Sequence, residues 1–185
     1  MIALCVGHSR PNDSGAASVA GVSEWDYNSE LAEMVGSKLK LPYKVYSVYK
    51  GTGYVTAMRW LARKLKEDNV DTAVELHFNA ATPKATGHEW LYWHSSEKGR
   101  LLSCALRDSF EDSFPMFKSR GIKGRKKGDR GAYFLRATSM PACIAEPFFG
   151  TCASPDWDLA TNNKQGIATA IAEGLSLYTE ISERW

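Results

Sequence analysis

The chain has 185 residues, a formal net charge of +2 and 44% hydrophobic residues. This length suits one domain with a sizeable core, and the composition argues against a largely disordered chain. No apolar stretch approaches the roughly 18 residues of a membrane-spanning helix, and the N-terminus has no signal-peptide pattern. We therefore expect a protein that is made in the cytoplasm without a signal peptide and does not insert into membranes. The cysteines include no C-x-x-C pair, and Cys5 and Cys143 lie within apolar strand-like runs, where a cysteine usually serves as a small buried hydrophobic residue, so a disulfide framework is unlikely.

Strand-like and helix-like segments alternate along the chain. Apolar or alternating runs predict strands at residues 2–6, 43–49, 70–78, 90–93, 132–135 and 141–149. Helical spacing of apolar residues predicts helices at residues 24–39, 55–65, 98–110 and 163–181. Ser23 is expected to cap the first helix, with Asp26 completing a variant of the capping box. The alternation predicts an α/β fold over residues 1–185: a single domain with a mostly parallel twisted sheet flanked by helices on both faces.

Two histidines stand where predicted strands end. His8 follows the first strand after Gly7, and His77 lies at the end of the third. Either one alone would more often be an ordinary loop or core residue. In a parallel sheet, however, the carboxyl ends of the strands share one edge, where ligands gather in α/β proteins, so the two imidazoles can converge there. Two neutral imidazoles and one carboxylate, with an open fourth position, commonly hold a catalytic zinc ion.

The sequence offers two carboxylates as the third ligand. Glu24 lies in the first turn of the helix that follows the loop after His8, although an acidic residue there can simply complement the helix dipole. Glu75 alternates with His77, so both side chains point to the same face of their strand. Glu75 could be a ligand itself or could orient the imidazole as a hydrogen-bond acceptor. From the residues alone, both assignments stay open.

Glu146 is the candidate catalytic residue. It follows the apolar residues 142–145, which should be deeply buried. A carboxylate at the end of such a strand is costly unless it is paired, coordinated or protonated. Partial burial would raise its pKa towards neutrality, which suits a general base that takes a proton from water and passes it to a leaving nitrogen.

Four short motifs span nearly the whole chain. They are Gly7-His8 followed by Asp13-Ser14-Gly15-Ala16, Glu24 with Asn28, His77-Phe78-Asn79-Ala80, and Glu146 with Phe149. In these motifs and their order, the chain resembles the zinc-dependent N-acetylmuramoyl-L-alanine amidases of the third amidase family, in the compact form found among phage endolysins.

The resemblance implies one Zn²⁺ per chain, bound by His8, Glu24 and His77, with Glu146 as the catalytic residue. It is the resemblance that favours Glu24 over Glu75. The implied reaction is hydrolysis of the amide between N-acetylmuramic acid and L-alanine in peptidoglycan, which causes cell-wall lysis once the enzyme is released from the cytoplasm.

The chain departs from the family pattern near these residues. Glu75 stands where a serine is usual, and Pro147-Phe148 replaces the small residue expected after the catalytic glutamate. These departures bear on the shape of the pocket. Asn79, in the third motif, is a candidate substrate-binding residue, and so are Arg130 and Arg136, because a nearby cation could stabilise an oxyanion.

Residues 116–131 are predicted to be a basic loop. Its cations are Lys118, Arg120, Lys123, Arg125, Lys126, Lys127 and Arg130, and Asp129 is its acid. A solvated loop is the simplest interpretation; the functional one is attachment to a polyanionic envelope or to acidic groups of the peptide stem. The run has no recognised nucleic-acid-binding fold around it, so we expect no nucleic-acid partner.

Two other function classes remain compatible with the sequence. One is a zinc peptidase that cleaves a bond within the stem peptide. The other is a non-catalytic envelope-binding protein that uses the basic residues 118–130. For the amidase we expect peptidoglycan as the partner, a monomer, and no separate domain for binding the cell wall.

Overall fold

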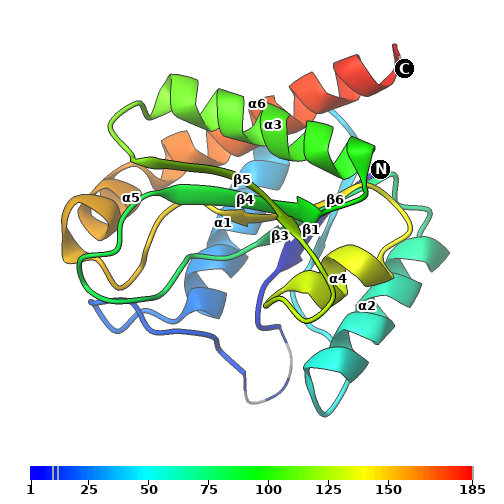
Figure 1. Cartoon of the computed structure of the whole chain (residues 1–185), viewed down its shortest axis with the longest axis horizontal. Helices are drawn as coiled ribbons and strands as arrows, with labels where there is room; N and C mark the ends of the chain where they lie inside the picture. Colours follow the sequence, from blue (N-terminus) through cyan, green and yellow to red (C-terminus); the bar gives the residue numbers. More distant parts are fainter. Residues whose placement is uncertain (10, 12, 185) are drawn as a thin grey trace.

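The computed structural model describes residues 1–9, 11 and 13–184, and a six-stranded sheet of order β2-β1-β3-β6-β4-β5 lies at its centre (Figure 1). The strands are β1 (Ile2–Val6), β2 (Tyr43–Tyr46), β3 (Thr72–Leu76), β4 (His88–Trp93), β5 (Ser119–Arg125) and β6 (Ala142–Glu146). Neighbouring strands are parallel except for β4 and β6, which are antiparallel. The predicted mostly parallel α/β sheet is therefore confirmed.

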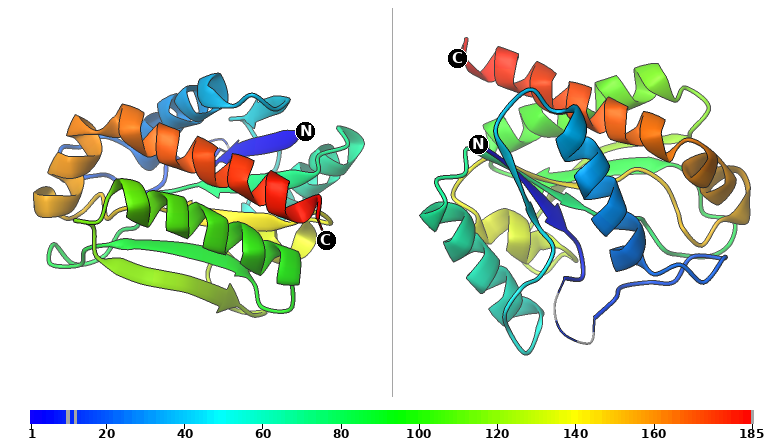
Figure 2. Two further views of the ribbon diagram at one scale, coloured as in Figure 1. Left: turned by 90° about the horizontal axis from the view of Figure 1, so that it is seen from above. Right: turned by 180° about the vertical axis from the view of Figure 1, so that it is seen from behind.

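Helices cover both faces of this sheet, as predicted. They are α1 (Glu24–Lys38), α2 (Tyr54–Glu67), α3 (Glu97–Ser113), α4 (Ala132–Ala137), α5 (Asp158–Asn162) and α6 (Lys164–Ser182). Helices α1, α3 and α6 pack on one face and α2 and α4 on the other, so the sheet separates two apolar cores (Figures 1 and 2). None of these helices, within the described part of the chain, is long and apolar enough to cross a bilayer.

The central strands are buried on both faces, which explains their almost continuous apolar sequence. In β1, Leu4 faces the core under α1 and α6, whereas Ala3 and Cys5 face the core under α2. The helix that follows is capped as expected: Ser23 Oγ accepts a hydrogen bond from the Asp26 backbone N–H at 3.1 Å. The Ser23 hydroxyl also donates to the Asp26 carboxylate at 2.6 Å. These local hydrogen bonds fix the start of α1 at Glu24.

Two predicted segments differ from the structure. Residues 132–135, expected as a strand, belong to helix α4. Gly131, just before the helix, has a left-handed φ of 77°. Ala132, Phe134 and Leu135 are buried. A short apolar run of this kind is compatible with either a helix or a strand. The basic segment 116–131 is not all loop, because β5 runs through it. An edge strand carries charged side chains, so its sequence looks like that of a loop.

A buried acid connects the loops at the carboxyl edge of the sheet. The side chain of Asp156 is 0% exposed and accepts hydrogen bonds from the backbone N–H groups of Gly87 and Phe149, both at 2.9 Å. The Thr86 hydroxyl donates a third bond to the same carboxylate. Through these three hydrogen bonds, Asp156 holds the segment after β6 against the segment before β4.

Candidate active site

The two histidines converge at the carboxyl edge of the sheet. β1 and β3 are parallel neighbours, with Val6 opposite Leu76, so His8 and His77 emerge side by side. Their ring centroids are 5.1 Å apart. Gly7 is required for this approach, because a Cβ at that position would lie 2.3 Å from the His77 ring. His8 has a left-handed φ of 59°, a conformation that non-glycine residues adopt rarely and that clusters at functional sites.

Glu24 joins the two histidines from the first turn of α1. Its side chain is 3% exposed, and its two oxygens face one imidazole each: Oε1 lies 2.7 Å from Nδ1 of His77, and Oε2 lies 3.4 Å from Nε2 of His8. The backbone N–H groups of Phe78 and Ala16 donate to the same carboxylate at 3.2 and 3.1 Å. The carboxylate is thus held between the two imidazoles.

Each imidazole also has a carboxylate at its other nitrogen. Nδ1 of His8 lies 3.0 Å from Oδ1 of Asp13, and Nε2 of His77 lies 3.3 Å from Oε2 of Glu75. Carboxylates in these positions fix the orientation of zinc-binding histidines and raise their basicity. The placement of Glu75 matches the orienting role, on the side of the His77 ring opposite Glu24.

The donor set fits a zinc ion. One ligand atom from each of His8, Glu24 and His77 lies within 4.8 Å of the others. Two imidazole nitrogens and one carboxylate oxygen are a common catalytic zinc set, and both imidazoles have the outer carboxylate that such ligands need. The residues present could therefore hold Zn²⁺ with a position left for substrate or water.

The pKa values of Glu24 and His77 reflect the excess of carboxylates around the imidazoles. Burial by itself raises the pKa of Glu24, but the hydrogen bond and positive charge of His77 lower it below its ordinary value. Burial by itself lowers the pKa of His77, but its contacts with Glu24 and Glu75 raise it well above its ordinary value. Without a metal, a proton on His77 therefore balances the surrounding carboxylates.

Glu146 lies at the end of β6, in a cavity of about 380 Å³ that the three clustered residues also line. Its carboxyl group has no hydrogen-bond partner among the described residues. Burial raises the pKa of its carboxyl to about 7; the charge of Glu89 acts in the same direction, and that of His77 opposes it. A carboxyl group with this pKa exchanges protons readily near neutral pH, as a general base must.

Of the three residues suggested for substrate binding, two line the cavity and one does not. Asn79 and Arg130 are in its wall. Arg136 is not: its guanidinium lies over the ring of Tyr133, 5.3 Å from the centroid, and it lines a different hollow beside Trp93. The reason is that this segment is a helix and not a strand, which turns Arg136 away from the edge where the histidines lie. We therefore remove Arg136 from the candidate site.

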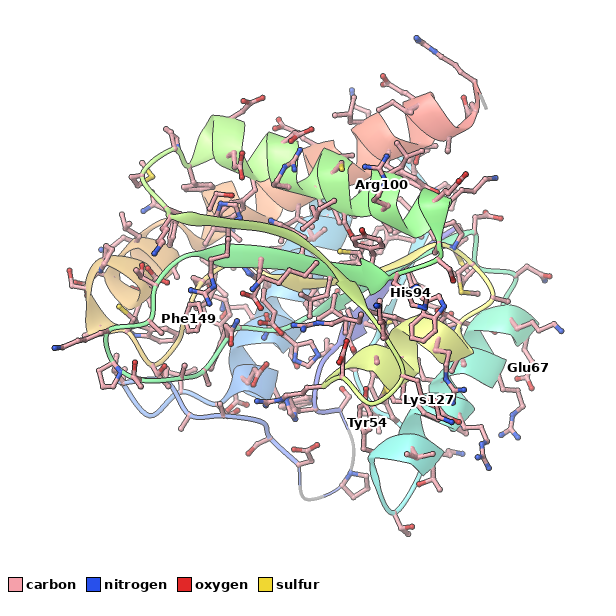
Figure 3. The ribbon with its side chains drawn as sticks, in the orientation of Figure 1. Tyr54, Glu67, His94, Arg100, Lys127 and Phe149 are labelled. Carbon is pink, nitrogen blue, oxygen red and sulfur yellow. The ribbon has the colours of Figure 1, made fainter. Side chains whose placement is uncertain are left out.

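The structure adds residues that the sequence reasoning missed. Glu89 and Arg125, from β4 and β5, line the cavity. Tyr54, at the start of α2, lines it as well (Figure 3). The available signal was the alternation of Lys123 and Arg125, which places both on one face of a strand. In a segment interpreted as a loop, that alternation had no structural meaning.

Known proteins similar to this chain include several N-acetylmuramoyl-L-alanine amidases. Residues 2–176 match the family model Amidase_3, described as N-acetylmuramoyl-L-alanine amidase. The chain is similar in structure to the N-acetylmuramoyl-L-alanine amidase AmiC2 of Nostoc punctiforme, with 22% identity, 97% of each chain covered and a TM-score of 0.80. It is similar to the CwlD amidase from Clostridioides difficile, solved in complex with the GerS lipoprotein, with 18% identity, 97% of this chain and 98% of that chain covered and a TM-score of 0.83.

A third similar structure is the catalytic domain of the CD27L endolysin targeting Clostridia difficile, with 27% identity, 94% of this chain and 95% of that chain covered and a TM-score of 0.76. No curated protein matches the chain in sequence.

Proposed function

Because the chain belongs to the Amidase_3 family of N-acetylmuramoyl-L-alanine amidases, which act on peptidoglycan, we propose that its activity depends on one Zn²⁺ held by His8, Glu24 and His77, with Glu146 as the catalytic residue. One observation carries the proposal: ligand atoms of two imidazoles and a carboxylate lie within 4.8 Å of one another in the lining of a cavity that also holds Glu146. The bond cleaved is the amide between N-acetylmuramic acid and L-alanine.

The residues of the chain divide the work between binding and proton transfer. When bound, zinc supplies Lewis acidity, which polarises the amide carbonyl and makes a water molecule more acidic. Asp13 and Glu75 keep the two imidazoles in the orientation that a ligand needs. Glu146, whose pKa of about 7 leaves it partly ionised at neutral pH, accepts a proton from the attacking water and returns it to the leaving nitrogen.

The biological role that we propose is cell-wall lysis by an endolysin. The similarity to the CD27L catalytic domain, at 27% identity, supports this role. In this proposal the monomeric enzyme is made in the cytoplasm and reaches peptidoglycan after release. Hydrolysis of the muramoyl amide separates the peptide from the glycan strand, so the wall loses its cross-links.

The test combines metal analysis with product mapping. We expect elemental analysis of the purified protein to find about one zinc per chain, and we expect a chelator to abolish peptidoglycan digestion and added zinc to restore it. The new amine termini should map to L-alanine. Digestion that persists without zinc would contradict the metal role, and new termini on another stem residue would indicate a zinc peptidase instead.

A further inference from the structure

A group of cations surrounds a buried carboxylate on the wall of the cavity away from the histidines. Glu89 on β4 is 4% exposed and stands opposite Glu146 in the antiparallel pairing of β4 with β6. Arg120 Nε lies 2.8 Å and Lys123 Nζ 2.6 Å from Oε2 of Glu89. Arg125 Nη2 lies farther away, 3.7 Å from Oε1. Three cations thus share one carboxylate.

Arg120 and Lys123 are sufficient to neutralise Glu89. Burial by itself raises the pKa of Glu89, but the hydrogen bonds from Lys123 and Arg120 lower it below its ordinary value, so the carboxylate is ionised. Arg120 is held in place further by the ring of Phe149, whose centroid is 5.0 Å from its guanidinium carbon. The positive charge of Arg125 is therefore not needed to neutralise Glu89.

Arg125 lines the cavity and carries a hydrogen-bond donor that the described residues leave without a partner. It is one of the lining residues, and its side chain is 26% exposed. Its Nε is buried and has no hydrogen-bond partner among the residues that the structure describes. A buried donor without an acceptor is unfavourable, and a guanidinium matches a carboxylate through two parallel hydrogen bonds. Arg130 adds a second cation to the wall of the same cavity.

The chemistry of the substrate indicates which anion would bind there. In peptidoglycan, the N-acetylated sugars are uncharged, and the lactyl carboxyl of muramic acid is consumed in the scissile amide. Negative charge in the substrate therefore lies on the peptide, beginning with the free α-carboxylate of the γ-linked D-glutamate that follows L-alanine. Arg125 lines the same cavity as Glu146, the proposed catalytic residue.

We propose that Arg125, supported by Arg130, binds a carboxylate of the stem peptide and makes the enzyme selective for stems whose second residue carries a free α-carboxylate over stems in which it is amidated. This proposal rests on the proposed function. Arg125 acts as a specificity residue. The ion pairs of Glu89 with Arg120 and Lys123 stabilise the part of the cavity wall that carries Arg125.

The experiment compares two synthetic muramoyl peptides of equal length, one with D-isoglutamate and one with D-isoglutamine after L-alanine. We expect the zinc-loaded wild type to hydrolyse the acid with a kcat/KM about tenfold to a hundredfold higher than the amide, the range for a charge-assisted hydrogen bond. Arg125→Gln should bring that ratio close to one, mainly by raising KM for the acid. Arg125→Lys should keep part of the preference, because the charge remains.

The ratio between the substrates isolates carboxylate binding. Arg125 also lowers the pKa of Glu146, so its loss can change the rate on both substrates, but such a change cancels in the ratio. Arg125→Gln leaves Arg120 and Lys123 on Glu89, so the wall should remain folded. Arg100→Gln is the matched control, because Arg100 is exposed on α3 and is not a cavity residue (Figure 3).

A binding measurement separates this proposal from the proposed function. Calorimetry of the zinc-loaded protein with the dipeptides L-alanyl-D-isoglutamate and L-alanyl-D-isoglutamine needs no turnover. Tighter binding of the acid by wild type and Arg100→Gln, but not by Arg125→Gln, would support the subsite even if hydrolysis fails. Equal binding and equal hydrolysis of acid and amide would overturn the subsite and leave the amidase proposal intact.

Discussion

The two sides of the cavity solve opposite electrostatic problems. The first side is formed by β1, α1 and β3 and carries an excess of carboxylates. Both imidazole nitrogens of His8 and of His77 face a carboxylate there. On the other side, from β4 and β5, three cations share Glu89. The first arrangement suits a bound cation and the second a bound anion. This difference in charge is the basis for proposing a cation on the first side and an anion on the second.

The largest effect is expected when a proposed zinc ligand is removed. We expect His77→Ala to lose stoichiometric zinc and to reduce peptidoglycan hydrolysis to background, because only one imidazole and one carboxylate would remain in the set. Elemental analysis and a turbidity assay check both. His94→Ala is the control, since His94 is exposed and outside the cavity (Figure 3). A His77→Ala protein that keeps one zinc would disprove the assigned ligand set.

Glu146→Gln should cause the next largest loss. The amide is of similar size to the carboxylate but cannot accept a proton, so we expect kcat to fall about 10²- to 10⁴-fold, the usual contribution of general acid–base catalysis. Zinc content should stay at one per chain, because Glu146 is not among the clustered ligand atoms. Steady-state kinetics with a defined muramoyl peptide measures the effect. An unchanged kcat would refute the catalytic role.

A smaller effect is expected at Glu75, the carboxylate behind His77. If Glu75 orients the imidazole, Glu75→Gln should weaken zinc binding about 10- to 100-fold and leave the stoichiometry at one. Competition with a chromogenic chelator gives the affinity. Asp13→Asn, which changes the equivalent carboxylate behind His8, should show a loss of similar size. Complete loss of zinc from Glu75→Gln alone would mean that Glu75 is a ligand.

Zinc binding should also depend on pH. In the metal-free protein the pKa of His77 is raised well above its ordinary value of 6.5, because Glu24 and Glu75 outweigh the effect of burial. Zinc must displace that proton, so affinity should fall about tenfold for each unit below the folded pKa. The decline should begin above pH 6.5 and be weaker in Glu75→Gln, as isothermal titration at several pH values can measure. Zinc affinity independent of pH between 5 and 8 would show that His77 binds no proton.

The raised pKa of His77 also makes the stability of the metal-free protein depend on pH. A raised histidine pKa stabilises the folded state below the unfolded pKa, and this contribution disappears as pH rises through the folded pKa. Metal-free protein should therefore lose stability from this group on alkalinisation, and zinc should restore it there.

Elements with local signals could be predicted from the amino-acid sequence. Apolar runs that end at His8, His77 and Glu146 indicated buried strands, and because parallel strands end at a common edge, the meeting of the two histidines could be predicted. The Ser23 cap placed Glu24 in the first turn of α1 by hydrogen bonds within four residues. The family motifs lie on these same segments, which is why the resemblance and the structure agree.

Features that depend on pairing between distant segments could not be predicted from the sequence and required the folded structure. A short apolar run can be a strand or a helix, so the identity of α4, and with it the position of Arg136, depended on packing against the sheet. The basic segment became β5 because it pairs with β4, and that pairing set Lys123 and Arg125 on the face that holds Glu89. Glu75 could be placed behind His77, opposite Glu24, only once β3 and α1 were docked together. Side-chain direction is local, but the neighbours that a side chain meets are fixed by contacts far apart in the chain.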